Sequence, residues 1–330
     1  MGVLVGVDIG GTKTAVVLGR PRNDTLDIID REVFLTEPGV LSWRDTVARV
    51  VHTARQLLRK HEAGSVAGIG ISCGGPLDST AGLIQSPPNL PGWADVPITE
   101  ELERALGGRA YLQNDANACA LAEWRFGAGR GTRNMVFLTF GTGMGAGLVL
   151  DGRIYEGTNG LAGEVGHIRL AAEGPEGYGK KGSFEGYCSG GGIARLARSE
   201  AEKRLAAGQT ASFCPEREGL AGISAETVGR AAEAGDPLAL EIFARSGWFL
   251  GRALAMIIDL LNPQRIVIGS IYARCRRFIE PSMNEEIARE ALAPAAHVCE
   301  VVPAVLGETI GDYACLSAAM GAGTWEREER

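Results

Sequence analysis

The chain has 330 residues, of which 45% are hydrophobic and 22% charged, and a formal net charge of −7. This composition is typical of a soluble globular protein with one large domain or two ordinary ones. The acidic balance argues against a nucleic-acid or anionic-membrane surface, no apolar stretch has the length of a membrane span, and the start lacks the basic segment of a signal peptide. Seven scattered cysteines favour reduced thiols and a cytoplasmic protein.

Strands and helices alternate from the N-terminus onward, which predicts an α/β fold. Residues 3–7 and 14–18 are predicted strands on either side of the turn DIGGTK. Apolar residues at helical spacing predict a helix over residues 43–60, and a buried strand is predicted at 66–72.

The same alternation continues in the rest of the chain. A helix over 115–126 opens on the dipeptide ND, and NMVFLTFGTGMGAGLVLDG predicts a strand, a glycine turn and a second strand. A strongly apolar helix over 247–261 is stopped by an Asn-Pro pair and followed by the strand RIVIG. The stretch 205–224 is rich in Ala, Gly and Ser and is predicted to be surface loop.

Two segments resemble each other, VGVDIGGTKTAVVLG and VFLTFGTGMGAGLVLDG. Each is a predicted hairpin with a Gly/Thr turn, and two such turns can enclose a polyphosphate with backbone N–H groups and threonine hydroxyls. Asp8 stands where a carboxylate could hold hydrated Mg²⁺. Either turn alone is equally compatible with an ordinary hairpin, whereas the pair favours phosphate binding.

The stretch GPEGYGKKGS, residues 174–183, begins like the nucleotide-binding pattern G-x-x-x-x-G-K-[ST]. Lys181 occupies the position of the hydroxyl residue that ligates magnesium, and no strand precedes the stretch. It is therefore not predicted to be a phosphate-binding loop.

Five motifs occur in one order along nearly the whole chain: DIGGTKT, NDANACALAE, GTGMGAGLVLDG, GEVGHI and NPQRIVIG. In this order they resemble the ROK family of sugar kinases (repressor, open reading frame, kinase), and among its members the bacterial glucokinases. The resemblance implies the α/β actin-like ATPase (ribonuclease H-like) fold, with two lobes and the ligands in the cleft between them. It implies a smaller N-terminal lobe over 1–118, completed by the C-terminal segment 312–330, and a larger lobe over 119–311.

The resemblance also implies a reaction, the ATP- and Mg²⁺-dependent phosphorylation of a hexose at its 6-hydroxyl. Glucose, giving glucose 6-phosphate, is the expected substrate. Other acceptors stay open because the motifs GEVGHI and NDAN are shared by kinases for them: mannose, fructose, allose, N-acetylglucosamine and N-acetylmannosamine. Polyphosphate as the donor in place of ATP stays open too, and a homodimer or homotetramer is expected.

A different class of protein also occurs among such chains, the sugar-responsive repressors. Those carry a DNA-binding helix-turn-helix before the kinase fold, whereas here the first predicted strand begins at Val3 and the chain is acidic. A sugar sensor without catalysis is a third possibility. Asp115 and the two intact Gly/Thr turns argue against it.

The resemblance assigns the site residues position by position. Asp115 matches the catalytic base, although its spacing alone favours a helix N-cap. The sugar-binding residues are Gly75, Asn89, Asn114, Asp115, Glu164, His167 and Glu185. The nucleotide-binding residues are Asp8, Gly10, Gly11, Thr12, Lys13, Thr139, Gly141, Thr142, Gly143 and Gly269, with Mg²⁺ held by Asp8 through water.

Three of the sugar-binding side chains, Glu164, His167 and Glu185, are expected at the hydroxyls near the anomeric carbon, with Asn89 on the other side of the ring. Carboxylates and imidazole discriminate hydroxyl stereochemistry by directional hydrogen bonds. Each residue has an ordinary alternative: Glu164 as a solvated loop residue, His167 as a core histidine, and Lys13 as a solvated turn lysine.

In ROK kinases the motif GEVGH precedes a loop C-x-C-G-x-x-G-C-x-E, in which three cysteines join the histidine around a structural zinc. Here that pattern falls on EGYGKKGSFE, and its cysteine positions hold Glu176, Tyr178 and Ser183. Structural zinc takes four nitrogen or sulfur ligands, and only His167 remains. The sequence therefore predicts no structural zinc, and Cys188, three residues past Glu185, is predicted to be a small buried hydrophobe. Packing and hydrogen bonds from residues 176–187 are expected to orient His167 instead, with Tyr178 and Phe184 filling the space of the zinc site.

Overall fold

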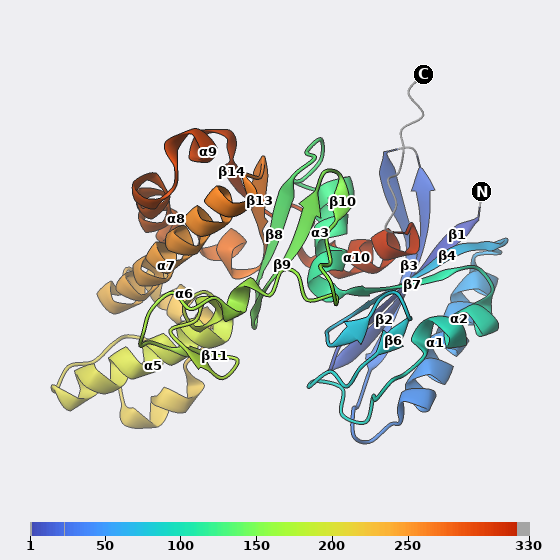
Figure 1. Ribbon diagram of the computed structural model, residues 1–330. Coiled ribbons are helices and arrows are strands. Elements are labelled where there is room, and N and C mark those ends of the chain that lie inside the picture. The colour runs from blue at the N-terminus through green and yellow to red at the C-terminus, as the bar shows by residue number, and fades with distance from the viewer. Residues whose placement is uncertain (1, 23, 322–330) are drawn as a thin grey trace. The chain divides into compact units, whose positions relative to one another are not determined.

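The computed structural model describes residues 2–22 and 24–321 (Figure 1). Contacts divide the chain into two compact units. The first contains the chain up to Phe137, Gly147–Ala162 and the part from Val305 onward, and the second contains Leu138–Ala146 and Gly163–Ala304. The predicted lobe boundaries, after residues 118 and 311, fall inside helices of the first unit and stay predictions. Part of the predicted segment 312–330 lies outside the described residues.

The first unit is built on a five-stranded sheet of order β3-β2-β1-β4-β7. Its strands are β1 Val3–Ile9, β2 Lys13–Arg22, β3 Thr25–Leu35, β4 Val66–Cys73 and β7 Ala110–Asn114. The first three strands are antiparallel neighbours, whereas β1, β4 and β7 run parallel. Parallel neighbours bring their carboxyl ends to one edge of the sheet, and this edge carries the candidate site. Two short strands, β5 Leu77–Asp78 and β6 Leu83–Ile84, form a separate pair.

Helices cover both faces of this sheet (Figure 1). They are α1 Trp43–Lys60, α2 Ile98–Leu106, α3 Asp115–Phe126 and α10 Ile310–Ala319, with the short turn η3 Gly307–Thr309 before α10. Alternate residues of β1 enter different cores, because successive side chains of a strand point to opposite faces. Val5 and Val7 pack in the core that includes residues of α1, and Leu4 packs with residues of α10.

Glycines allow α10 to lie close against the sheet. A Cβ atom at Gly6 would lie 2.5 Å from Cys315 Sγ, and one at Gly70 would lie 1.9 Å from the Cys315 carbonyl oxygen. Neither distance is sterically possible, so any larger residue would push the helix away. The segment from residue 310 to 319 is thereby packed against β1 and β4.

The second unit contains most of a second sheet, of order β10-β9-β8-β13-β14. Its strands are β8 Met135–Phe140, β9 Met144–Leu150, β10 Arg153–Ile154, β13 Arg265–Ile268 and β14 Glu300–Pro303. The chain passes between the two units within β8 and β9. The predicted strand, glycine turn and strand in this segment are confirmed as β8, residues 141–143 and β9.

The helices of the second unit follow β10 in the chain. They are η1 Val165–His167, α4 Phe184–Tyr187, α5 Gly190–Ala206, η2 Arg217–Gly222, α6 Ala225–Glu233, α7 Pro237–Leu261, α8 Ile271–Glu290 and α9 Ala293–Val298. A small hairpin, β11 Glu176–Gly177 and β12 Lys180–Lys181, lies between η1 and α4 in the chain. Helices α7 and α8 pack along each other.

Most element predictions are confirmed, including the helices over 43–60 and 115–126. The helix predicted over 247–261 begins ten residues earlier, at Pro237, because Asp236 caps it by accepting the Leu238 and Ala239 amide hydrogens. The stretch 205–224 is only partly loop, since it starts inside α5 and contains η2. Among residues 2–22 and 24–321, no helix combines the length and apolarity that a membrane crossing requires.

Candidate active site

Polar residues of the first unit gather where its parallel strands end. Asp8 on β1 is in register with Ser72 on β4, and Cys73 at the end of β4 is in register with Asn114 at the end of β7. The carboxyl ends of parallel strands are the usual place of ligand sites in α/β proteins. Asp8, Asn114 and the following Asp115 therefore lie at the edge of the sheet where such a site is expected.

The first turn of α3 places Asp115 beside two other predicted sugar-binding positions. Asn114 is the N-cap residue, because its side-chain oxygen accepts the Ala116 amide hydrogen at 3.0 Å. Asp115 is the first helical residue, so the N-cap role that its spacing favoured belongs to its neighbour. A Cβ atom at Gly74 would lie 3.9 Å from Asp115 Oδ2 and 3.7 Å from Asn89 Nδ2. The amide and the carboxylate thus flank the same glycine.

The first Gly/Thr turn lies against the same group. The Gly10 amide donates to the Lys13 carbonyl at 3.0 Å and closes the turn between β1 and β2. A Cβ atom at Gly11 would lie 2.8 Å from the Asn89 carbonyl oxygen, so only glycine permits this approach. Thr12 and Lys13 are exposed. The predicted phosphate turn and the predicted sugar loop therefore meet within the first unit.

Gly75, the remaining sugar-binding position of this unit, lies next to Asn114. A Cβ atom at Gly75 would lie 3.5 Å from Asn114 Nδ2, which is ordinary van der Waals contact. The peptide bond from Gly75 to Pro76 is cis. The backbone at Gly75 thus passes directly beside the N-cap residue of the helix that carries Asp115.

The carboxyl group of Asp8 has a pKa above its ordinary value. Its pKa is raised to about 6, mainly by burial and also by the negative charges of Asp115 and Asp312, while a hydrogen bond with Ser72 and the positive charge of Arg31 oppose the rise. Arg31 Nε donates to Asp312 Oδ1 at 2.7 Å. A hydrated divalent cation would relieve the repulsion among these carboxylates. The residues present therefore fit Mg²⁺, which binds one or two carboxylates and keeps several waters.

The second Gly/Thr turn lies in the second unit, between β8 and β9. The amide of Gly190, the first residue of α5, donates to the Gly141 carbonyl at 2.8 Å, and the Gly191 amide donates to the Thr142 carbonyl at 3.4 Å. The Thr139 hydroxyl accepts the Gly145 amide hydrogen at 2.9 Å. The start of α5 thus fixes the turn, whose glycines leave room for a ligand.

Gly269 is the last predicted nucleotide-binding position. It follows β13, and its amide donates to the Leu138 carbonyl at 3.0 Å. This amide hydrogen is engaged in the sheet, so it is not presented to a phosphate. A nucleotide role for Gly269 would have to come from the absence of a side chain.

The predicted sugar-binding residues of the second unit surround η1 and α4. Glu164 is exposed and His167 is half-buried, and the His167 amide donates to the Glu164 carbonyl at 3.2 Å. Glu185, in α4, accepts the Met144 amide hydrogen with its Oε2 atom at 3.1 Å. Helix α4 contacts η1. The three polar side chains are therefore carried by adjoining segments of one unit.

The three positions of the family's zinc cysteines do not fit a structural zinc. Glu176 and Tyr178 are exposed, and the buried Ser183 hydroxyl caps α4 by accepting the Gly186 amide hydrogen at 3.1 Å. Across the described part of the chain, no group of three or more His, Cys, Asp or Glu side chains could hold a metal ion. Cys188 is fully buried, as predicted, and its burial raises the thiol pKa well above the ordinary value.

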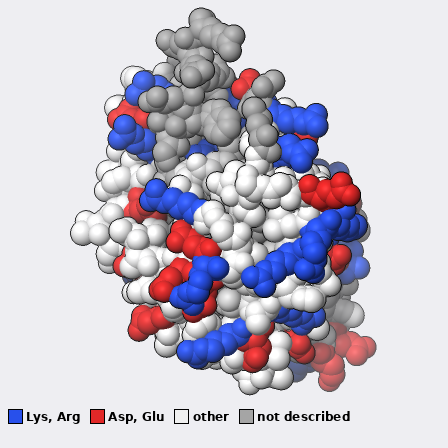
Figure 2. Space-filling model, turned by 90° about the vertical axis from the view of Figure 1, so that its right-hand side faces the viewer, with Lys and Arg blue, Asp and Glu red and all other residues white. Residues whose placement is uncertain are grey.

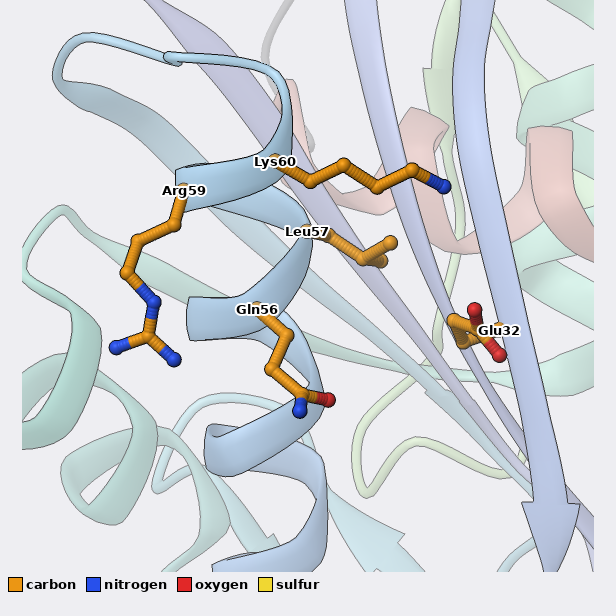
Figure 3. Close-up of a pocket in the computed structure, with 5 residues that line it drawn as sticks. All are labelled: Glu32, Gln56, Leu57, Arg59 and Lys60. Carbon is orange, nitrogen blue, oxygen red and sulfur yellow. The ribbon is translucent and has the colours of Figure 1, made fainter.

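A cavity of about 520 Å³ is lined by none of the predicted site residues (Figure 3). Five residues of α1 and β3 line it: Glu32, Gln56, Leu57, Arg59 and Lys60. Lys60 reaches towards β3, where it pairs with Asp30 at 2.8 Å, and Arg59 points away from the strand. The cavity is an open depression between a helix and a strand and brings together no catalytic groups.

Charged side chains of both signs are interspersed on the face drawn in Figure 2. A nucleic-acid site would instead show a basic stripe. This face has the mixed charge of an ordinary protein surface.

Four residues around the candidate site, Arg31, Ser72, Lys180 and Asp312, were not predicted from the sequence. The pKa of Asp8 is influenced by Ser72, Arg31 and Asp312. Arg31 and Asp312 are hydrogen-bonded to each other although they are far apart in the chain. Only the polar Ser72 at the end of an apolar strand gave a signal. Tyr178, expected at His167 from the sequence, contacts its ring, and Lys180, which was not expected, donates to its carbonyl oxygen.

Two α/β sheets, glycine-rich turns and carboxylates at strand ends define a protein of the actin-like ATPase fold. The chain belongs to the ROK family, whose model matches residues 4–324. A glucokinase of Thermotoga maritima is 33% identical over 309 residues, which cover 93% of this chain and 94% of the glucokinase.

Two solved structures support the same fold. A ROK family glucokinase from Streptomyces griseus in complex with glucose and AMPPNP has a TM-score of 0.72 at 28% identity, covering 97% of this chain and 99% of that chain. A ROK family transcriptional regulator, a homologue of the Escherichia coli MLC protein, has a TM-score of 0.81 at 26% identity, covering 96% of this chain and 78% of that chain. The α/β actin-like fold expected from the sequence is confirmed.

Proposed function

We propose that the protein transfers the γ-phosphoryl group of ATP to the 6-hydroxyl of a hexose, with glucose as the preferred acceptor. The observation that carries the proposal is the grouping of the turn at residues 10–13, Asn89 and Asp115 within one unit. These are a phosphate-binding element, a hydroxyl-binding amide and a carboxylate base. The similarity to glucokinases of Thermotoga maritima and Streptomyces griseus supports glucose as the acceptor.

In this reaction Asp115 accepts the proton of the sugar 6-hydroxyl. The hydroxyl oxygen forms a bond to the γ-phosphorus while the bond from that phosphorus to the bridging oxygen breaks, and ADP leaves. Positioning and charge neutralisation supply most of the catalysis. The backbone amides of residues 10–13 and the side chain of Lys13 would bind phosphate oxygens. Mg²⁺ held through water by Asp8 would neutralise phosphate charge.

Sugar recognition is assigned to hydrogen-bonding side chains. Asn89 and Asn114 supply amides, which donate and accept, and Glu164, His167 and Glu185 supply acceptors for hydroxyl protons. A site built from such paired groups rejects a sugar whose hydroxyl is missing or inverted, because buried polar groups would then lack partners.

The test is a coupled assay of ADP formation with Mg-ATP and each of six sugars: glucose, mannose, fructose, allose, N-acetylglucosamine and N-acetylmannosamine. We expect the highest kcat/KM for glucose. A higher value for another sugar would correct the substrate, and no turnover with any of them would contradict the proposal. Replacing ATP by polyphosphate identifies the donor in the same assay.

A further inference from the structure

The hairpin β11–β12 contains a backbone conformation that its sequence does not favour. Its two-residue turn is Tyr178–Gly179, with φ angles of 43° and 74°. Two positive φ values are typical of type I′ hairpin turns, which prefer Asn, Asp or Gly at the first position. Among the non-glycine residues with positive φ in the described chain, Tyr178 is the sole aromatic one. A bulky side chain in this region is an outlier that needs a compensating contact.

The compensating contact is with His167. The centroids of the Tyr178 and His167 rings lie 5.0 Å apart, and the ring planes meet at 83°. This edge-to-face arrangement is a favourable geometry for two aromatic rings. Tyr178 is 69% exposed, so burial of apolar surface does not explain its place. The ring is held where it meets the imidazole.

A second side chain of the hairpin holds the backbone at the same residue. The Lys180 ammonium donates to the His167 carbonyl oxygen at 2.7 Å, and Lys180 is half-buried. The next lysine, Lys181, is exposed, and its carbonyl oxygen accepts a hydrogen bond from Arg169 Nη1 at 2.7 Å. Tyr178 thus contacts the His167 ring, and Lys180, two residues later, contacts the His167 main chain.

The base of the hairpin is anchored to the segment that follows His167. The Leu170 amide donates to the Gly182 carbonyl at 2.8 Å, and the Phe184 amide donates to the Ile168 carbonyl at 2.8 Å. A Cβ atom at Gly182 would lie 2.1 Å from the Ala171 carbonyl oxygen, so the two backbones are in close contact. Phe184 itself is fully buried. The hairpin therefore has a fixed place relative to η1.

We propose that the hairpin Glu176–Lys181 positions His167 without a metal, with Tyr178 and Lys180 as the positioning residues. A histidine that binds a metal is oriented by its bond to the ion. Here the ring contact with Tyr178 and the hydrogen bond from Lys180 to the His167 carbonyl oxygen orient it instead. The inference rests on the proposed function, because it assigns His167 to the sugar. It predicts that the hairpin affects sugar binding more than it affects stability.

Tyr178→Asn separates these two effects. Asn before Gly is the preferred pair in a type I′ turn, so the melting temperature should equal or exceed that of the wild type. The His167 ring loses its contact, so KM for the sugar should rise about fivefold, the scale of one lost directional contact, with kcat nearly unchanged. Tyr178→Phe keeps the ring and should keep the wild-type KM.

Lys180 and its neighbour Lys181 provide a second test with a matched control. Lys180→Met should raise KM for the sugar about fivefold, since the bond to the His167 carbonyl is lost, and Lys181→Met should not. A wild-type KM in both Tyr178→Asn and Lys180→Met would overturn the inference. So would a parallel loss of melting temperature and sugar affinity in Tyr178→Asn, because that result describes a purely structural turn.

The His167 ring gives a readout that does not depend on activity. The chain has four histidines, so the imidazole proton resonance of His167 can be assigned from a His167→Gln spectrum. It should move in Tyr178→Asn and stay in place in Lys181→Met, and an unmoved resonance in Tyr178→Asn would overturn the inference. If the wild type phosphorylates no hexose, the proposed function fails, while this spectrum still decides whether the hairpin holds the ring.

Discussion

The Glu185 carboxylate accepts a hydrogen bond from the Met144 amide at 3.1 Å. Met144 directly follows the second Gly/Thr turn, and Glu185 is one of the proposed sugar-binding residues. The proposed phosphate turn and the proposed sugar-binding residue Glu185 are therefore joined by one hydrogen bond. Substitution of Gly143 in this turn should affect both ligands, whereas substitution of Gly10 in the first turn should affect mainly the nucleotide.

Gly143→Val and Gly10→Val test this difference. A Cβ atom at Gly143 would lie 2.9 Å from Glu185 Oε2, so Gly143→Val should weaken nucleotide and sugar binding together, each by roughly tenfold or 1.4 kcal/mol. At Gly10 the nearest atom would be the Lys13 carbonyl oxygen at 3.0 Å, so nucleotide affinity should fall and sugar affinity should change little. Calorimetric titration of both ligands measures the four values. Equal loss of sugar binding in Gly10→Val would make the first turn a structural element.

Asp115→Asn tests the base. The amide keeps the shape of the side chain but cannot accept the hydroxyl proton, so kcat should fall by at least about 10²-fold. Sugar binding, followed by calorimetry, should persist. Asp27→Asn, a substitution of an exposed carboxylate on β3, is the matched control and should keep full activity. Turnover near the wild-type rate in Asp115→Asn would remove this residue from the mechanism.

Asp8→Asn should make the protein more stable and less active. The unfolded chain has the ordinary pKa of 3.8 at Asp8 and the folded chain a pKa of about 6. Between these values the folded state holds a proton that the unfolded state has lost, so the stability of the wild type falls as the pH rises. Above pH 6 the full penalty is present, at most about 3 kcal/mol. The neutral amide removes it.

Chemical denaturation at several pH values measures this effect. Asp8→Asn should have the larger free energy of unfolding at pH 8, and its advantage should shrink as the pH falls from 6 towards 3.8. Asp27→Asn, at an exposed carboxylate, is the control for the Asp-to-Asn change itself. Destabilisation by Asp8→Asn at pH 8 would show that the charged carboxylate is needed for folding.

Because the hairpin segment beside His167 lacks the family's zinc cysteines, we expect the purified protein to contain no stoichiometric zinc. Of the four positions of the family's zinc site, only His167 carries a nitrogen or sulfur ligand. A chelator should stop turnover, and Mg²⁺ alone should restore it fully. His167→Ala should raise KM for the sugar and lower the melting temperature less than loss of a folding metal would. Elemental analysis that finds about one zinc per chain, lost in His167→Ala, would contradict this prediction.

The fold could be predicted where its cause is local. The helix over residues 43–60 has an apolar face and a capping box of Ser42 and Asp45, both visible in the sequence. The strand VLVGVDI has apolar residues on both faces and a glycine where α10 approaches, and its burial follows from its composition.

Long-range contacts could not be predicted in the same way. The pair Arg31 and Asp312, which influences Asp8, joins residues separated by 281 positions. No spacing rule connects them. The positive φ of Tyr178 could not be predicted either, because tyrosine is not a residue that type I′ turns favour. The sequence showed that the cysteines were missing, and the structure shows the aromatic contact of Tyr178 with the His167 ring. The hydrogen bond from this segment goes to the His167 carbonyl rather than to the imidazole.

The most direct test of the proposed kinase activity is phosphorus NMR of the purified protein with Mg-ATP and glucose. We expect a phosphomonoester resonance from the 6-position of glucose that grows in step with ADP. With Asp115→Asn it should grow at least about 10²-fold more slowly. Inorganic phosphate growing in place of the sugar ester, or no consumption of ATP with any of the six sugars, would contradict it.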